Sequence, residues 1–368
     1  MTGSQRQALT LTKRLIVKLG TSSILHKDGR VQGEVLLPLA RQIASLREQG
    51  VQVVLVSSGA VGMGRRTRSG ARIEPKQLAA KQALAALGQV ELMNMWRDLF
   101  ELLGIDVAQV LLTRQELSRR ERYLNARNTL TTLLNAGILP VVNENDSVAT
   151  DEIRFGDNDI LSALVSSLVE ADLVINLTRA EGLLDLSQSS EHPVVISEVS
   201  SVDEQLYGMV APELSEGGTG GMASKLHAAK EAARFGAAMV IASSEQDNVL
   251  LDILAGTEVG TLFWPAEHPL RGRKRWLASS TLVSGALLVD RGAERALSQK
   301  GSSLLGVGIA EVEGNFGIGD VVTIKDLDGE ELGRGLCERS STELNLESGN
   351  LEGIVVVHRD NLFLKTGD

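Results

Sequence analysis

The chain of 368 residues is long enough for two or three domains, and its 43% hydrophobic but only 3% aromatic residues predict a large aliphatic core. Its formal net charge of −10 disfavours a general nucleic-acid or membrane-surface binder, and its single cysteine, Cys337, excludes an internal disulfide and indicates a reducing compartment. Because the N-terminal segment lacks a signal-peptide core and no run of about 18 uncharged apolar residues occurs, we expect a cytoplasmic protein that contacts no membrane.

Short apolar, β-branched runs alternate with helical patterns over the first two thirds of the chain. The predicted strands are 14–20, 51–59, 106–113, 138–145, 172–178 and 237–244. Nearly continuous apolar strands separated by helices predict an α/β fold with an open, mainly parallel sheet sandwiched by helices. Residues 75–103 form a long helical pattern, in which we expect a break near Gly88.

The pattern changes after about residue 265, where glycines recur between short β-rich runs. We therefore expect an α/β domain over 12–268, a basic linker over 269–280 and a small, mostly β domain over 281–363.

Polar and glycine-rich clusters follow four strands. "VKLGTSS" (17–23) places a lysine in an apolar strand; Lys18 needs a nearby anion unless its side chain simply extends to water. "VSSGAVGMG" (56–64) is either an anion-binding turn or only a tight connection between strand and helix.

The third cluster, "VVNENDSVATDEIRFGDND" (141–159), crowds carboxylates and carboxamides at the end of a strand. The fourth, "GGTGGMASK" (217–225), leads from consecutive glycines into an apolar helix, which favours a phosphate-binding loop over a flexible linker. Together, two lysines, two glycine-rich turns and a carboxylate-rich loop indicate phosphoryl transfer, which depends on positioning and positive charge. The five histidines show no metal-ligand spacing, and the P-loop pattern is absent.

With these blocks in order, the chain resembles the amino acid kinase family. The resemblance rests on "VKLGTS", "VSSGAVGMG", "LLTR…RRERYLNARNTL", "PVVNENDSVATDEIRFGDNDILSA" and "GTGGMASK". The block "NENDSVAT…GDND" resembles the members that phosphorylate glutamate rather than the acetylglutamate, aspartate or uridylate kinases. The segment "VDRGAERAL…KGSSLLGVGI…VEGNFGIGDVV" resembles a PUA domain.

The resemblance implies ATP-dependent phosphorylation of the γ-carboxylate of L-glutamate, with Mg²⁺ on the nucleotide. It implies that Lys18 and Lys225 contact the transferred phosphoryl group and that Asp159 orients both lysines. It implies that three residues hold the glutamate: Ser58, Asp146 and Asn158. The implied nucleotide-binding residues are Lys18, Thr178, Arg179, Thr219, Gly220, Gly221, Met222, Ala223, Ser224 and Lys225.

The resemblance also implies the first step of proline biosynthesis, inhibition by proline, and transfer of the product to a glutamate-5-semialdehyde dehydrogenase. We expect a homo-oligomer, a dimer or a tetramer, although a core helix of a monomer would give the same pattern at 75–103. The chain departs from the family at Arg179, where an acid is usual, and at Leu184, which replaces a tyrosine. Arg179 either reaches a phosphate or points to solvent.

Two alternatives remain open. The first is an RNA-binding regulatory role for the C-terminal domain. Since residues 277–368 contain 8 basic and 15 acidic residues, we do not expect RNA binding unless the basic "RGRKR" segment contributes. The second is another amino acid kinase; an acetylated substrate would leave Asp146 without an ammonium partner.

Overall fold

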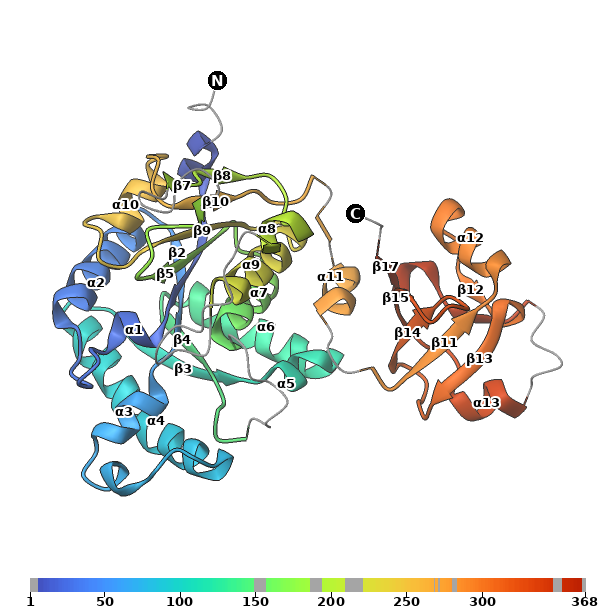
Figure 1. Ribbon diagram of the computed structural model, residues 1–368, viewed down its shortest axis with the longest axis horizontal. Coiled ribbons are helices and arrows are strands. Elements are labelled where there is room, and N and C mark those ends of the chain that lie inside the picture. Colours follow the sequence, from blue (N-terminus) through green and yellow to red (C-terminus); the bar gives the residue numbers. More distant parts are fainter. Residues whose placement is uncertain are drawn as a thin grey trace. The chain divides into compact units, whose positions relative to one another are not determined.

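The computed structural model describes residues 6–148, 157–185, 194–208, 221–267, 269–270, 272–279, 283–346 and 353–365 (Figure 1). These residues form two compact units. The first unit contains the described residues up to Thr113 and those of Asn125–Pro269. The second unit contains Arg114–Leu124 and the described residues from Leu270 onward.

The first unit is built on an eight-stranded sheet with the strand order β3-β4-β2-β1-β5-β9-β10-β8. The pairs are parallel except for the antiparallel pair of β9 and β10. The strands are β1 (Arg14–Leu19), β2 (Gln52–Ser57), β3 (Val107–Leu112), β4 (Leu139–Glu144), β5 (Leu173–Thr178), β8 (Glu198–Val199), β9 (Ala238–Ser243) and β10 (Thr261–Phe263). The predicted open, mainly parallel sheet is therefore confirmed, and six of these strands lie within the six predicted ranges.

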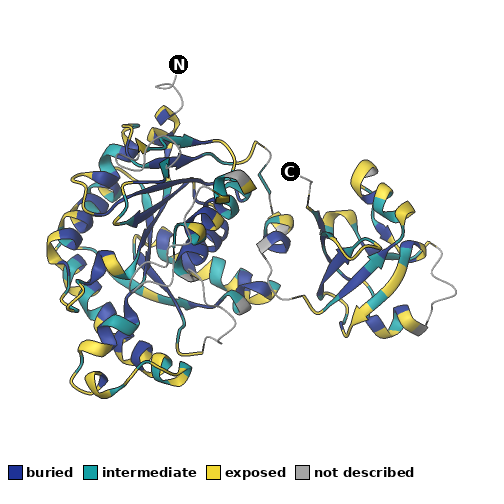
Figure 2. Ribbon diagram, viewed as in Figure 1, coloured by how far each residue is buried: buried dark blue, intermediate teal, exposed yellow. Residues whose placement is uncertain are grey.

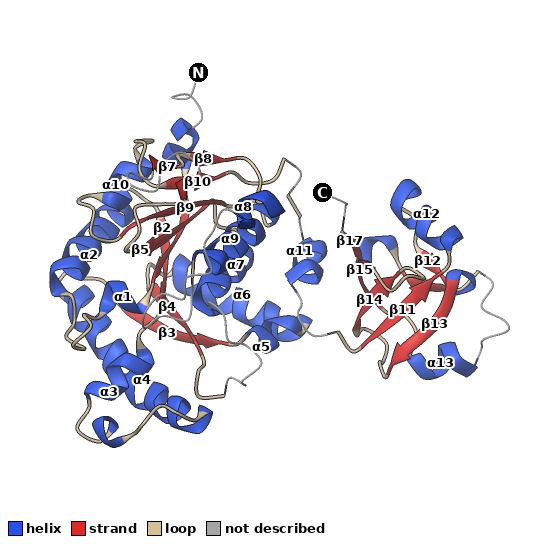
Figure 3. Ribbon diagram, in the orientation of Figure 1, coloured by secondary structure: helices blue, strands red, loops and turns tan. Residues whose placement is uncertain are grey.

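Helices cover both faces of this sheet (Figure 3). Helices α2 and α10 pack together on one face, and α7 and α9 pack together on the other (Figure 1). The helices of the first unit are α1 (Thr21–Ile24), α2 (Gly33–Glu48), α3 (Ala60–Arg66), α4 (Leu78–Glu101), α7 (Asp157–Val169), α8 (Glu204–Gly208), α9 (Met222–Arg234) and α10 (Val249–Leu254), with the 3-10 segments η2 (Arg6–Leu11) and η3 (Gly70–Arg72) and a small pair of strands, β6 (Leu184–Asp185) and β7 (Val194–Val195). Helix α6 (Arg120–Asn135) begins in the second unit and continues in the first.

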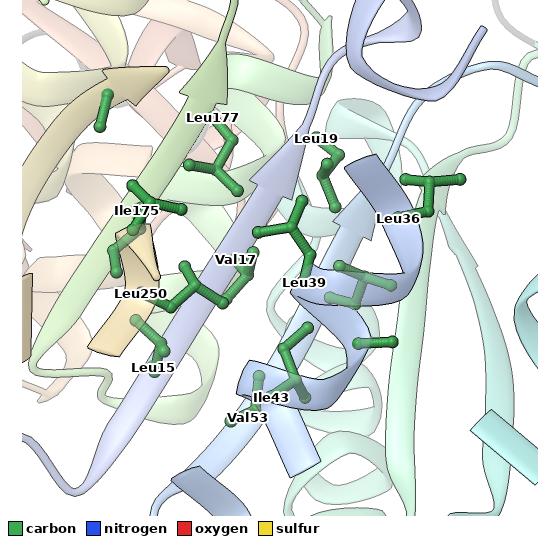
Figure 4. Packing of buried hydrophobic residues seen from close by; sticks show 14 of the residues in the cluster. Leu15, Val17, Leu19, Leu36, Leu39, Ile43, Val53, Ile175, Leu177 and Leu250 are labelled. Atoms are coloured by element: carbon green, nitrogen blue, oxygen red, sulfur yellow. The ribbon is translucent and has the colours of Figure 1, made fainter. Parts of the chain in front are cut away.

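Strand β1 shows how the sheet separates core from site. Its alternate residues Leu15, Val17 and Leu19 are fully buried and lie beside Leu39 and Ile43 of helix α2 (Figure 4). Because side chains alternate between the faces of a strand, Lys18 belongs to the opposite face, and α7 packs against β1. The apolar half of the strand thus anchors it, while the other half presents a lysine.

Helices α3 and α4 approach each other closely at glycines. A Cβ atom on Gly88 would lie 1.8 Å from the carbonyl oxygen of Ala60, and one on Gly64 would lie 2.0 Å from that of Leu84. The break that we predicted near Gly88 is wrong, because α4 continues through this residue from Leu78 to Glu101. Gly88 is required here by the close contact between helices, and not by a change in the direction of the backbone.

The second unit contains the sheet β13-β11-β14-β15-β17 and a separate buried core that includes Leu287, Val322 and Ile324 (Figure 2). Its strands are β11 (Gly285–Val289), β12 (Leu304–Leu305), β13 (Ile309–Gly314), β14 (Val321–Lys325), β15 (Glu331–Leu336), β16 (Val355–Val357) and β17 (Leu362–Leu364). Its helices are α5 (Arg114–Ser118), α11 (Gly272–Ser279), α12 (Arg291–Lys300) and α13 (Ser341–Leu346), with the 3-10 segments η4 (Gly306–Gly308) and η5 (Arg359–Asn361). The predicted small, mostly β C-terminal domain is confirmed.

The segment expected as a linker contains helix α11. Its Trp276 is 1% exposed and donates a 3.1 Å hydrogen bond from Nε1 to the carbonyl oxygen of Leu117 in α5. The guanidinium of Arg120 lies over the rings of both Tyr123 and Trp276. Residues 114–124 are therefore held in the second unit by α11. Within the described ranges, no helix combines the length and the apolar character that crossing a membrane would need.

Candidate active site

Three charged side chains meet at the carboxyl-end edge of the large sheet, and we call them the ionic cluster: Lys18, Asp159 and Lys225. Asp159 forms an ion pair through Oδ1 with the ammonium of Lys18, and its Oδ2 lies 3.1 Å from Nζ of Lys225. Their exposed fractions are only 5%, 1% and 7%, respectively. The structure thus places Asp159 between two lysines that are far apart in the sequence.

The local fold explains this convergence. Lys18 lies near the carboxyl end of β1, Asp159 in the first turn of α7, and Lys225 in the first turn of α9. Helix N-termini carry partial positive charge, so two of them favour an anion at this edge. A Cβ atom on Gly20 would lie 3.6 Å from Nζ of Lys18, which places the ammonium beside the turn after β1.

The ionic cluster contains two cations and one carboxylate. Burial alone would raise the pKa of Asp159, but Lys18 and Lys225, together with hydrogen bonds from Lys18 and Ser224, hold its pKa well below its usual range. Burial lowers the pKa of Lys18; Asp159 opposes this effect, and Lys225 adds to it. Asp159 is therefore ionised at neutral pH, and by formal charge the cluster has two basic side chains for one carboxylate, which is one positive charge in excess.

Neutral side chains complete the hydrogen bonds of Asp159. Asn176 of β5 donates from Nδ2 to Oδ1 over 3.0 Å, and Ser224 donates from its hydroxyl to Oδ2 over 2.7 Å. Asn176 is fully buried. These two donors orient the carboxylate, so each of its oxygens faces one lysine.

A second polar group, which we call the amide chain, lies at the same edge and consists of Ser58, Gln89, Asn143 and Asn158. The backbone N–H of Glu144 donates to Oδ1 of Asn143 over 2.9 Å and to Oδ1 of Asn158 over 3.2 Å. Since a backbone N–H can only donate, these bonds fix which end of each carboxamide is the oxygen.

The direction of the remaining bonds follows. Nδ2 of Asn158 donates to the hydroxyl of Ser58 and to Oδ1 of Asn143, each over 2.9 Å. Nδ2 of Asn143 donates to Oε1 of Gln89 in α4 over 2.8 Å. Nε2 of Gln89 is then a buried donor with no hydrogen-bond partner among the described residues.

Two consecutive residues of α7 belong to different groups: Asn158 to the amide chain and Asp159 to the ionic cluster. Successive residues on a helix point about 100° apart. Asn158 consequently faces β2 and β4, whereas Asp159 faces β1, β5 and α9. On the β2 side, the turn to α3 depends on Gly59, whose φ of +108° lies in the left-handed region that other residues rarely adopt.

The other predicted site residues lie nearby or outside the described ranges. Asp146 is half-buried in the turn after β4, and Thr178 ends β5. Gly221 precedes α9, and Met222, Ala223 and Ser224 form its first turn with Lys225. Thr219 and Gly220 lie outside the described residues.

A cavity of about 580 Å³ lies beyond the carboxyl ends of β5 and β9. Arg179 lines it from the position after β5 and Ser243 from the end of β9, and Ser197 and Gly260 line it from the segments before β8 and β10. Three carboxylates also line it: Glu181, Glu245 and Glu258. The side chain of Arg179 is exposed. Asn176, which binds Asp159 of the ionic cluster, lies two residues before the end of β5, so the cluster is close to the cavity along this strand.

Sequence reasoning missed Asn143, Asn176 and Gln89 as members of these groups, although Asn143 lies in the carboxamide-rich stretch 141–159. Asn176 carried a signal, because it is a polar residue inside the apolar run "LVINLT". Gln89 carried none, since a glutamine in a helix is usually exposed. No group of three or more His, Cys, Asp or Glu that could hold a metal occurs among the described residues, and both oxygens of Asp159 are engaged by lysines.

The chain is similar to known proteins over nearly its whole length. Residues 13–243 match the amino acid kinase family, and residues 285–351 match the PUA domain. A glutamate 5-kinase from Thioalkalivibrio sulfidiphilus is 46% identical over 98% of this chain and 99% of its own length. A glutamate 5-kinase from Caldanaerobacter subterraneus subsp. tengcongensis is 44% identical over 95% of this chain and 97% of its own length.

Among solved structures, a carbamate kinase from Giardia lamblia bound to AMP-PNP is similar to this chain. It has a TM-score of 0.51 and 15% identity, and the match covers 69% of this chain and 99% of that one. At this identity the likeness shows only that the fold is the same.

Proposed function

The chain belongs to the amino acid kinase family, and from this premise we propose that it catalyses the glutamate 5-kinase reaction, the transfer of the γ-phosphoryl group of ATP to the γ-carboxylate of L-glutamate. The observation that carries this proposal is the ionic cluster, in which two buried lysines converge on one carboxylate and leave one positive charge in excess. An anion is the natural complement of such a site. The near full-length similarity to glutamate 5-kinases supports the choice of substrate.

The reaction requires no general base. A glutamate side chain has a pKa of about 4.3 and is ionised at neutral pH. One oxygen of the γ-carboxylate attacks the γ-phosphorus of ATP, a new O–P bond forms, and the bond to the β,γ-bridging oxygen breaks. The products are γ-glutamyl phosphate and ADP. No proton is transferred in this step.

The difficulty of the reaction is that one anion must approach another. The excess charge of Lys18 and Lys225 stabilises the oxygens of the phosphoryl group as negative charge shifts toward ADP. Asp159 keeps both lysine side chains aligned at close range, and its charge opposes the lowering of the pKa of Lys18 by burial. The two helix N-termini add partial positive charge at the same point.

Glutamate recognition depends on the amide chain. The hydroxyl of Ser58 accepts a hydrogen bond from Asn158, so its own hydrogen is available to a carboxylate of the substrate. Asn158 lies there without negative charge and does not repel that carboxylate. Asp146 supplies a carboxylate for the α-ammonium, which an N-acetylated substrate lacks.

The nucleotide would occupy the cavity beyond β5 and β9, with its phosphates toward Lys18 and Lys225. Arg179, the residue after Thr178, lines this cavity, and the first turn of α9, from Met222 to Lys225, would lie at the phosphate end. Since no cluster of metal ligands occurs among the described residues, Mg²⁺ would be held mainly by the oxygens of the nucleotide phosphates. Bound there, it would neutralise part of the phosphate charge.

Hydroxylamine trapping tests the proposed reaction, because it converts an acyl phosphate into a hydroxamate. With ATP and Mg²⁺, we expect hydroxamate from L-glutamate and much less from L-aspartate or N-acetyl-L-glutamate. Equal or greater product from N-acetylglutamate would contradict the role of Asp146. No product from any of the three acids would contradict the proposed reaction itself.

We further propose that proline inhibits the enzyme by competing at the glutamate site, as the family resemblance implies. Unchanged activity at proline concentrations well above that of glutamate would disprove this. A cytoplasmic location, a homo-oligomer and transfer of the product to a glutamate-5-semialdehyde dehydrogenase belong to the same proposal. The exposed side chains of Leu87 and Val90 on α4 offer an apolar surface for self-association, which the molecular mass in solution would test.

A further inference from the structure

We propose that Arg6, near the N-terminus, is a positioning residue that shapes the nucleotide cavity from behind its wall. This inference rests on the proposed function, because it takes the cavity beyond β5 and β9 as the nucleotide site. Arg6 does not line the cavity, but it binds the segments that do.

Arg6 is buried, with an exposed fraction of 3%. Its Nη1 donates to the carbonyl oxygens of Val259 over 3.0 Å and Thr257 over 3.2 Å. Its Nη2 donates to the carbonyl oxygens of Ser197 over 2.6 Å and Gly260 over 3.2 Å. One side chain from η2 therefore joins the segment before β8 to the segment before β10.

Three of these four acceptor residues are walls of the cavity: Ser197, Val259 and Gly260. The backbone of the segment before β10, which forms this wall, is closely packed on both sides. Gly260 has a φ of +63°, and a Cβ atom there would lie 2.2 Å from the carbonyl oxygen of Ile241. On the other side, a Cβ atom on Gly256 would lie 3.2 Å from the carbonyl oxygen of Arg6. Loss of Arg6 would thus remove the hydrogen bonds that hold the closely packed segment 256–260 in place.

The geometry requires an arginine. Its planar guanidinium presents five N–H donors in a fixed fork, whereas a lysine presents one point charge. Four backbone carbonyls in two segments match this fork. Glu198 lies 3.5 Å from Nε and partly neutralises the buried charge.

Arg6 also influences the electrostatics of the cavity. Three glutamates line it, and a nucleotide is itself an anion. The carbonyl oxygens of Ser197, Val259 and Gly260 point toward Arg6, a cation that does not line the cavity, which reduces the negative potential that they add inside it. The positive charge of Arg6 behind the wall acts in the same direction.

Calorimetric titration of the full-length protein with ADP, together with steady-state kinetics and thermal unfolding, tests the inference in Arg6→Met and Arg6→Lys. Arg14→Met is the matched control, because Arg14 also donates to a backbone carbonyl and to a carboxamide, but at the opposite edge of the same sheet. For Arg6→Met we expect the Kd for ADP and the KM for ATP to rise about tenfold or more. The KM for glutamate and the kcat at saturating ATP should change less than about threefold, and Arg6→Lys should be intermediate.

Arg14→Met should lower the melting temperature without changing the Kd for ADP. An unchanged Kd for ADP in folded Arg6→Met would overturn the inference, as would an equal loss of ADP affinity in Arg14→Met. If Arg6→Met does not fold, Arg6→Lys decides: wild-type ADP affinity in that variant overturns the inference, and a selective loss supports it. If the wild-type protein does not bind ADP, the proposed function fails rather than the role of Arg6 alone.

Discussion

The ionic cluster and the amide chain lie at the same edge of one sheet, yet they are built on opposite principles. In the ionic cluster, three buried charges do not sum to zero, and both oxygens of Asp159 are shared between lysines and neutral donors. In the amide chain, no member is charged, and one backbone N–H determines the direction of every bond. The ionic cluster therefore acts through its charge, and the amide chain acts through the fixed directions of its hydrogen bonds.

This difference indicates a division of labour. Buried positive charge in excess is unfavourable until an anion binds beside it. It stabilises the transferred phosphoryl group most in the transition state, where that group carries the most negative charge. A neutral chain of fixed direction distinguishes ligands by shape and by donor and acceptor pattern. Changes in the ionic cluster should therefore affect turnover, and changes in the amide chain should affect the KM for glutamate.

The largest effect is expected for Asp159→Asn. This change leaves two buried ammonium groups without their carboxylate, which should lower the free energy of unfolding by about 3–5 kcal/mol and kcat by about 1000-fold. Urea denaturation and initial rates at pH 7 measure both quantities. Asp172→Asn is the control, because Asp172 accepts hydrogen bonds from the backbone N–H groups of Lys13 and Arg14 at the opposite edge. Wild-type stability of Asp159→Asn would contradict the account.

Lys18→Met should separate activity from stability. It removes the excess buried charge, so turnover should fall about 100-fold or more, while stability at pH 7 stays equal or rises by about 1–2 kcal/mol. The pKa of Lys18 is lowered in the folded state, so its ionisation destabilises the wild type below that value. As pH rises through the folded pKa toward about 10.4, the wild type should recover this stability, and the advantage of Lys18→Met should shrink.

Chemical denaturation of both proteins between pH 6 and 10 measures this difference. A loss of stability in Lys18→Met as large as that in Asp159→Asn would show that the cluster has no excess charge.

Asn158→Asp should act mainly on glutamate binding. The new carboxylate cannot donate to Ser58 or Asn143, and it repels the carboxylates of the substrate. We expect the KM for glutamate to rise about 100-fold, consistent with about 3 kcal/mol for a lost buried hydrogen bond with added repulsion, while the KM for ATP changes little. Asn135→Asp, at an exposed end of α6, controls for the added charge. Equal changes in the KM for glutamate and the KM for ATP would contradict the separate roles of the amide chain and the ionic cluster.

Arg179→Asp should have the smallest effect. Arg179 lines the cavity but is exposed, and exposed charges contribute at most about 1 kcal/mol, or about fivefold in affinity. We expect the KM for ATP and for GTP to change by less than this factor and in the same direction. A change of tenfold or more, or a reversed preference between ATP and GTP, would assign Arg179 a direct contact with the nucleotide.

The sequence predicted the parts of the fold that depend on local pattern. Nearly continuous apolar runs gave the strands, because a parallel sheet is buried on both faces. The polar residues after those strands indicated the edge at which Lys18 and Asp159 meet, since carboxyl ends of parallel strands share one edge.

What the sequence could not predict depends on long-range contacts. Gln89 contacts Asn143, 54 residues away, and nothing in its own helix distinguishes it from an exposed glutamine. Gly88 suggested a helix break, but its reason lies in the backbone of another helix. Arg6 lies far from any motif and is explained only by four carbonyl groups more than 190 residues later.

The most direct test of the central claim is the comparison of Lys225→Ala with Lys230→Ala, two lysines of the same helix α9. If the ionic cluster stabilises the phosphoryl group in transit, Lys225→Ala should lower kcat by about 100- to 1000-fold and leave the KM for glutamate within about threefold, and Lys230→Ala should retain wild-type turnover. A kcat of Lys225→Ala close to that of the wild type would contradict the account.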